Sequence, residues 1–212
     1  MCACEGSSHS LNQTRICSAV IVFVRVLLVS LCALLVQGPR SASCIPVSEF
    51  FPFGTDSDFM TERSDDGGSG RINLTVMFPF FGNRHNKIYV NNNGVISFFN
   101  ELRDYRPGDF PLQDEIPIIA PYWADVDTTN SNGTVWYRES RDKDLLFKAT
   151  NEIRAFPAYR NFKTYWVFVA TWDEVGFFGA TGEGVNKKNT FQSVLVLDTT
   201  RRLSFVILNY AN

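Results

Sequence analysis

Apolar and polar residues alternate along several short stretches of the chain. Between Ile72 and Phe78 every second residue is a large apolar one, and this period of two is typical of a strand with one buried face. Pro79 is expected to end that strand, because proline has no N–H to donate to a ladder. Residues 165–172 are apolar at most positions, which predicts a central strand buried on both faces.

Tight turns separate other segments of strand length. Residues 88–90 and 95–98 flank an Asn-Asn-Asn-Gly sequence at 91–94, and Asn-Gly accepts the positive φ angles that a hairpin turn needs. Two further strands are predicted at residues 190–197 and 203–210, on either side of a polar turn.

The middle of the chain is predicted to hold one more hairpin and little helix. Residues 134–138 and 145–149 are interpreted as two strands around the polar residues 141–144. A helix is expected only within residues 151–162, where Pro157 limits it to short pieces. Many short strands with turns between them predict an all-β fold, an antiparallel β-sandwich or open barrel with at most one or two short helices.

The N-terminal segment has the pattern of a secretory signal peptide. Arg15 and Arg25 precede an apolar core at residues 26–36, and the small residues Ser-Ala-Ser follow at 41–43. We therefore expect residues 1–43 to be removed after Ser43, leaving a domain of residues 44–212. The alternative is a single-pass membrane anchor through residues 16–36, in which Arg25 near the centre would cost roughly 2.5–3.5 kcal/mol.

Composition narrows the classes of protein that this chain can belong to. The 212 residues include 19 Phe, and aromatic residues favour strands. The formal net charge of −2 indicates neither a nucleic-acid nor an anionic-membrane partner. Four of the five cysteines lie in the leader, so Cys44 alone remains, either for an intermolecular disulfide or as an unpaired thiol. One cysteine and His85 cannot build a zinc site, and no cofactor is expected.

Short aromatic motifs follow one another in a fixed order through nearly all of the predicted domain. They are residues 51–54, 78–82, 91–98, 120–127, 135–139, 172–176, 189–192 and 205–210. In kind and order they resemble the NIDO domain, the extracellular module of nidogen, alpha-tectorin and related matrix and membrane-mucin proteins. The chain stops at Asn212, about where the last segment of that pattern is expected, which is consistent with a fragment or a short isoform.

The resemblance implies a secreted or cell-surface interaction module without catalytic activity. Such a module would mediate cell–matrix adhesion or extracellular matrix assembly. Its expected partners are extracellular matrix or cell-surface proteins or glycans, not nucleic acids or small-molecule substrates. The resemblance supplies no set of binding residues, so candidate sites have to come from the residues themselves.

Acidic pairs and glycosylation triplets are the candidates for chemistry. Asp125 and Asp127 are candidate calcium ligands, which would fit a calcium- or carbohydrate-binding lectin-like module, although a turn cap at Asp127 explains them as well. A carboxylate-dependent hydrolase would use Asp125, Asp127, Asp173 or Glu174. The triplets that begin at Asn73 and at Asn132 predict N-linked glycans on a secreted glycoprotein.

Overall fold

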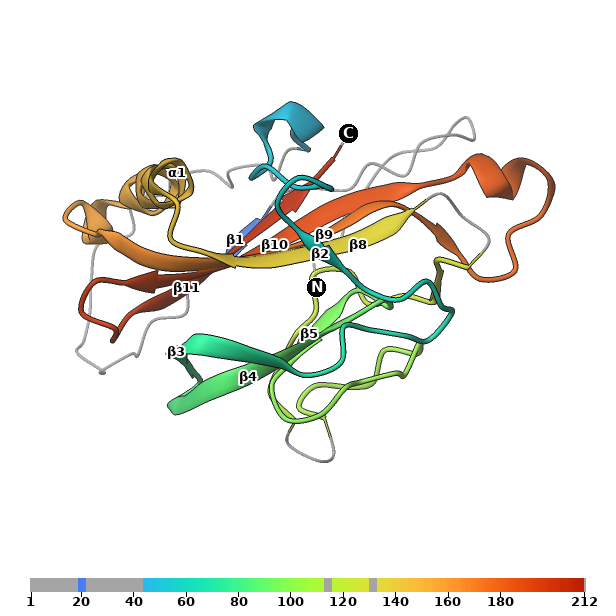
Figure 1. The fold of residues 1–212 in the computed structure, drawn as a ribbon, viewed down its shortest axis with the longest axis horizontal. Coiled ribbons are helices and arrows are strands. Elements are labelled where there is room, and N and C mark those ends of the chain that lie inside the picture. Colours follow the sequence, from blue (N-terminus) through green and yellow to red (C-terminus); the bar gives the residue numbers. More distant parts are fainter. Residues whose placement is uncertain (1–18, 22–43, 113–115, 130–132, 212) are drawn as a thin grey trace, which may run out of the picture.

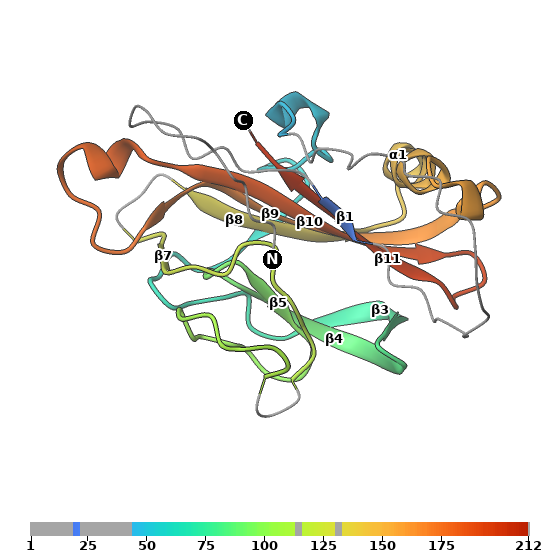
Figure 2. The same ribbon diagram turned by 180° about the vertical axis from the view of Figure 1, so that it is seen from behind.

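In the computed structural model, which describes residues 19–21, 44–112, 116–129 and 133–211, two antiparallel β-sheets face each other (Figure 1). A single α-helix, α1, covers the outer face of the larger sheet, so the described chain forms three layers (Figures 1 and 2). The predicted all-β sandwich is confirmed. The predicted leader lies outside the described residues except for Ala19–Ile21.

The larger sheet has seven strands in the order β1-β11-β10-β9-β8-β2, with β7 paired to one end of β9. Its strands are β1 (Ala19–Ile21), β2 (Phe59–Met60), β7 (Val126–Asp127), β8 (Thr134–Ser140), β9 (Thr164–Phe177), β10 (Asn189–Asp198) and β11 (Ser204–Tyr210). The smaller sheet runs β3 (Ile72–Phe80), β4 (Asn83–Asn91), β5 (Val95–Ser97) and β6 (Ile118–Ile119). Short 3-10 turns lie at Val47–Glu49, Pro157–Tyr159 and Gly182–Asn186.

Strand β9 is the central strand, and both of its faces are buried. It lies between β10 and β8, with Val169 opposite Val194 and Ala170 opposite Tyr137. Because side chains alternate across a strand, Trp166, Phe168 and Trp172 pack in the core between the two sheets. Val167 and Val169 face the other way, into the core beneath α1. The predicted strand at residues 165–172 is confirmed, and it is longer than expected.

Strand β8 confirms the strand predicted at residues 134–138, but helix α1 (Lys143–Arg154) replaces the strand predicted at 145–149, so the predicted hairpin is wrong. The Asp142 carboxylate accepts hydrogen bonds from the N–H groups of Asp144 and Leu145, and this N-cap begins the helix within the polar stretch 141–144. Leu145, Ala149 and Ile153 recur every four residues and are buried against the sheet. This helical period outweighs the strand-like composition of residues 145–149.

The helix predicted at residues 151–162 is displaced toward the N-terminus. Helix α1 ends at Arg154, and Pro157 then opens a 3-10 turn, where its missing N–H leaves no helical hydrogen bond unmade. Pro79 does not end β3 either, since it pairs with Arg84 and the strand continues to Phe80. Strand β3 is the outer strand of the smaller sheet, where a proline is tolerated.

The two hairpins predicted before and after β9 in the sequence are confirmed. Asn91 pairs with Val95 across the β4–β5 turn, and β10 pairs with β11 along its length. At the β10–β11 turn the Asp198 carboxylate accepts hydrogen bonds from the N–H groups of Thr200, Arg202 and Leu203. These bonds hold the reversal that leads the chain into β11.

Replacing Phe168 with alanine is expected to destabilise the fold. Phe168 is fully buried between the sheets, so Phe168→Ala should lower the free energy of unfolding by about 3–5 kcal/mol and reduce the secreted yield. Phe147 on α1 is 68% exposed, and Phe147→Ala should change stability by less than about 0.5 kcal/mol. Denaturant unfolding of both purified variants tests this. Equal midpoints for the two would mean that β9 is not the central strand.

Candidate functional site

Three consecutive buried asparagines form the turn between β4 and β5. Asn91, Asn92 and Asn93 are no more than 1% exposed, although asparagine is usually a surface residue. The sequence predicted this turn from Asn-Gly, and Gly94 does have a φ of 80°. Gly94 is also required sterically, since a Cβ there would lie 1.8 Å from the Tyr122 carbonyl oxygen. The burial of the three amides was not predicted.

The amide side chains of this turn hold the surrounding loops. Asn91 Oδ1 accepts the N–H of Leu102 at 2.8 Å. Asn92 Nδ2 donates to the carbonyl oxygens of Glu62 and Ser64 at 3.2 and 3.0 Å. Asn93 Oδ1 accepts the N–H of Val126 at 2.9 Å, and its Nδ2 donates to Asp66 Oδ1 at 2.8 Å. Segments far apart in the sequence are therefore fixed against one turn.

An acidic cluster lies beside that turn. Carboxylate oxygens of Asp65, Asp66 and Asp125 all lie within 4.8 Å of one another. Asp127, the other predicted calcium ligand, is not a member of this group. Its Oδ1 accepts the Thr129 N–H at 2.7 Å, which is the turn cap that the sequence offered as the alternative. Asp65 and Asp66 were missed, because their approach depends on the Asn93 contact and not on spacing along the chain.

The cluster has an unfavourable electrostatic environment. Burial raises the pKa of Asp65, and the neighbouring charges of Asp66, Asp127 and Asp125 raise it further. Asp65 Oδ1 is buried and has no hydrogen-bond partner within the described chain. Burial also raises the pKa of Asp125, with Asp66 and Asp127 adding to the effect. Three such carboxylates could contribute oxygens to a divalent cation, but calcium requires six to eight.

The acids proposed for a hydrolase lie apart from this cluster, at a bulge in β9. Val175 pairs with Asn189 and Trp172 with Phe191, so Asp173 and Glu174 together oppose the single residue Thr190. Glu174 is exposed with a φ of 47°, whereas Asp173 is half-buried. Burial and then Glu174 raise the pKa of Asp173, while a hydrogen bond from the Trp136 side chain lowers it.

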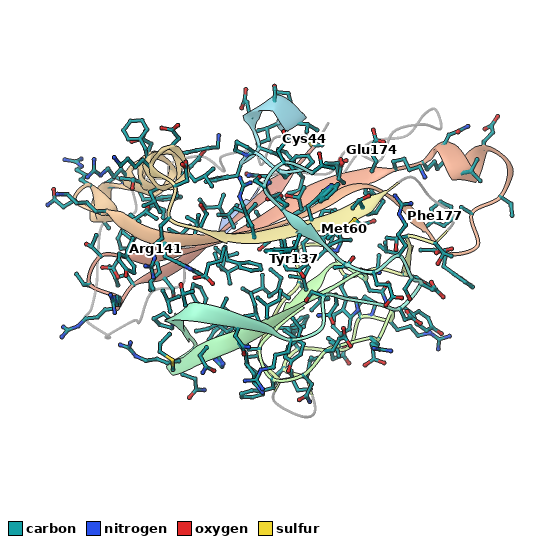
Figure 3. All side chains as sticks on the ribbon, viewed as in Figure 1. Cys44, Met60, Tyr137, Arg141, Glu174 and Phe177 are labelled. Carbon is teal, nitrogen blue, oxygen red and sulfur yellow. The ribbon has the colours of Figure 1, made fainter. Side chains whose placement is uncertain are left out.

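The modification candidates occupy different parts of the molecule. Asn73 is exposed on the outer strand β3, and Arg71 Nε donates to its Oδ1 at 2.9 Å. Asn132 lies outside the described residues, so the structure does not place it. Cys44 is half-buried and forms no disulfide within the described chain. Figure 3 places Cys44 on the side of the larger sheet that faces away from the smaller one.

Among the exposed apolar side chains of the described residues, two pairs that the sequence did not single out lie at strand positions or directly after a strand. At the outer strand β2, Phe59 and Met60 are 70% and 59% exposed, and Phe59 lies against Tyr137 with ring centroids 5.9 Å apart. At the end of β9, Phe177 and Phe178 are 43% and 56% exposed. Figure 3 shows Phe177 at this end of the molecule. These side chains are available to a partner, because neither pair packs into the core.

A groove accompanies the second of these places. It has a volume of about 280 Å³ and lies between β7 and the loop that follows β9. Its lining residues are Asp127, Gly176, Phe177, Phe178, Gly179, Ala180, Val185 and Lys188. Asp173 and Glu174 do not line it, so the groove does not bring a pair of facing carboxylates together as glycoside hydrolysis requires.

Comparisons with known proteins agree on one relationship. The profile of the nidogen-like domain family, NIDO, matches residues 86–212. Alpha-tectorin of Mus musculus is 41% identical over 166 residues, which cover 78% of this chain and 7% of that protein. Nidogen-2 of Mus musculus is 34% identical over 158 residues, 71% of this chain and 11% of that protein. Mucin-4 of Mus musculus is 25% identical over 177 residues, 76% of this chain and 5% of that protein.

The chain therefore spans a small part of each of these relatives. No solved structure matches it. None of the helices in the described part of the chain has the length and apolar character that a membrane span requires.

Removing one acid from the cluster is expected to stabilise the protein at neutral pH. Because the pKa of Asp65 is raised in the folded state, the fold binds this proton more tightly than the unfolded chain does. The ionised carboxylate therefore lowers the stability of the fold, and this loss is complete at pH values above the folded-state pKa. Asp65→Asn should therefore raise the melting temperature at pH 7 by roughly 1–4 °C. The gain should vanish below 3.8, the ordinary pKa of an aspartate, where the native carboxyl is protonated too.

Melting curves at pH 7 and pH 3.5 or below, without divalent cations, measure this difference. Asp56→Asn is the matched control, since Asp56 is exposed in the turn after Gly54. A lower melting temperature for Asp65→Asn at pH 7 would contradict the electrostatic account.

Proposed function

The chain belongs to the nidogen-like (NIDO) domain family, and on that premise we propose that it is a secreted, non-catalytic adhesion module of the extracellular matrix. Residues 1–43 are its leader and residues 44–212 its working domain. The observation that carries the proposal is the family match, which covers the paired strands from β4 to β11. Nidogens and alpha-tectorin are extracellular matrix proteins, so the same kind of environment is expected for this chain.

The exposed residues around Phe177 and Phe178 are the contact surface that we assign to adhesion. Aromatic side chains are enriched at protein interfaces, because each one removes a large apolar area from water at little conformational cost. Val185, which is 49% exposed, lines the same groove and extends this surface. The surface lies at the end of β9, where Phe177 pairs with Val126 of the short strand β7.

Binding to a cell-derived matrix tests the proposed function. The secreted protein should bind decellularised fibroblast matrix saturably, and Phe178→Ser should weaken that binding about tenfold or more if Phe178 is a dominant contact. Phe147→Ser is the matched control, because Phe147 is exposed on α1, away from this surface. Equal binding by wild type and Phe178→Ser would remove the assignment of this surface, and absence of saturable binding would overturn the adhesion proposal.

Calcium dependence in the same assay distinguishes the proposed adhesion module from the lectin-like alternative. Binding should be the same in calcium and in EDTA if the module recognises matrix through apolar contacts. A saturable, calcium-dependent signal on a glycan array that Asp125→Asn abolishes would instead favour a calcium-dependent lectin. Turnover of a glycoside that Asp173→Asn abolishes would favour a hydrolase.

We further predict that Asn73 and Asn132 carry N-linked glycans. Asn73 projects from the outer strand β3 into solvent, so a glycan there would meet no packed side chains. N-glycosidase should increase the gel mobility of the secreted protein. Asn73→Gln and Asn132→Gln should each remove part of the shift, and the double variant should remove all of it. Secreted wild-type protein that shows no shift would refute this prediction.

A further inference from the structure

Strand β11 presents part of its main chain on the outer side of the larger sheet. The N–H of Ile45 donates to the Tyr210 carbonyl oxygen at 3.1 Å, while the N–H of Ala211 donates to the carbonyl oxygen of Thr190 in β10 at 3.0 Å. Tyr210 therefore directs its carbonyl away from β10. Because main-chain groups alternate along an antiparallel strand, Leu208 and Val206 also direct their N–H and carbonyl groups outward.

Strand β1 occupies that outer side. Ala19 is opposite Leu208 and Ile21 is opposite Val206, in antiparallel register. Residues 19–21 lie within the segment that the proposed function removes as a leader. In the mature chain, Val206 and Leu208 would then have no neighbouring strand on this side. An unpaired row of N–H and carbonyl groups is a template for another strand.

Once the leader is removed, the former position of β1 beside β11 is bounded at one end and open at the other. Ile45 belongs to the mature chain and keeps its bond to Tyr210, so it marks one limit of the free stretch. Toward the other end, a groove of about 710 Å³ opens between β11 and the β3–β4 turn. Its lining residues are Pro79, Phe80, Phe81, Gly82, Asn83, Arg84, Arg202, Leu203, Ser204 and Val206. The lining combines apolar side chains with two arginines and contains no acidic residue.

We propose that the outer side of β11, at Val206 and Leu208, receives an extended apolar segment of a partner protein as an added antiparallel strand. This proposal rests on the secretion and leader removal given under the proposed function. Main-chain hydrogen bonds supply affinity in this mode of recognition, and side-chain pockets supply selectivity. The groove beside Val206 is the pocket available to side chains of the added strand.

The direction of the added strand predicts an acidic residue in the partner. An antiparallel strand in the position of β1 runs from Leu208 toward Val206, so its C-terminal end points to Ser204 and Arg202. A carboxylate just after the apolar residues would reach Arg202 or, across the groove, Arg84. Charge-assisted hydrogen bonds from arginine to carboxylate are stronger than neutral ones.

A second copy of this chain fits the position less well. If two β11 strands paired about a twofold axis at Ile207, each Tyr210 would lie opposite the Ser204 of the other copy. In each copy the Ile45 N–H already donates to the Tyr210 carbonyl oxygen. Main-chain hydrogen bonds between the two copies would therefore be limited to Val206 and Leu208. The residues that follow Leu208 are Asn209 and Tyr210, and neither offers a carboxylate to the arginines.

Residue-resolved amide hydrogen exchange on the secreted protein tests the proposal, with its N-terminus sequenced first. The N–H groups of Val206 and Leu208 should exchange about tenfold or more faster than those of Phe205 and Ile207, which face β10. The probe is a synthetic peptide, Ser-Ala-Val-Ile-Val-Asp-Glu, which carries residues 18–22 followed by two acids. Its addition should slow exchange at Val206 and Leu208 and leave Phe205 and Ile207 unchanged.

Charge variants test the predicted acid. A peptide ending in Lys-Lys in place of Asp-Glu should bind about tenfold more weakly, and Arg202→Glu should reverse this preference. Arg160→Glu is the control, since Arg160 is exposed but does not line the groove. Both variants change a surface charge, so their folds should be retained.

Four results would overturn the proposal. A secreted protein that still begins near Met1 would keep β1 in place. Equally slow exchange at all four N–H groups without peptide would mean that the edge is not vacant. Equal binding of both peptides by wild type and Arg202→Glu would remove the acidic requirement. Protection of Val206 and Leu208 that appears only as protein concentration rises would identify a second copy as the occupant.

Discussion

The buried asparagine turn at residues 91–93 is the contact on which the two sheets and their loops depend. Trp172 of the central strand donates its indole N–H to the carbonyl oxygens of Asn91 and Asn92, at 3.1 and 3.0 Å. The larger sheet is thus hydrogen-bonded to the turn of the smaller one. Polar groups in such a place cost free energy unless they are paired, and these asparagine side chains are paired.

This arrangement separates a rigid frame from the surfaces that can bind. The frame is the β4–β5 turn, the central strand β9 and the loops that the amides hold. The side chains of Phe177 and Phe178 and the outer main-chain groups of β11 make none of these asparagine hydrogen bonds. A partner at either place could therefore bind without disturbing the asparagine contacts.

The sequence predicted features that depend on local pattern. The strand at residues 165–172, the Asn-Gly hairpin and the paired strands before and after Asp198 follow from period-two burial and turn chemistry. Helix α1 was missed because Asp142 was interpreted as part of a turn and not as an N-cap, and the four-residue spacing from Leu145 to Ile153 was not used.

The candidate sites were harder to predict, because they are built from residues distant in sequence. Nothing near Asp125 indicates that Asp65 and Asp66 lie within 4.8 Å of it, since the approach is fixed by the Asn93 side chain. Likewise, a run of three asparagines suggests a solvated turn. The turn can be buried because the loops at 61–70 and 120–128 provide hydrogen-bond partners for its amide side chains. The preference of asparagine for the surface is overridden here by tertiary contacts.

Unfolding of an Asn92→Asp variant tests the role of this turn most directly. The substitution keeps the shape of the side chain but replaces an amide donor to Glu62 and Ser64 with a carboxylate oxygen that faces their carbonyl oxygens. The account predicts a loss of about 3 kcal/mol or more at pH 7, and little change for Asn100→Asp, because Asn100 is exposed. An Asn92→Asp protein that unfolds at the wild-type denaturant concentration would contradict it.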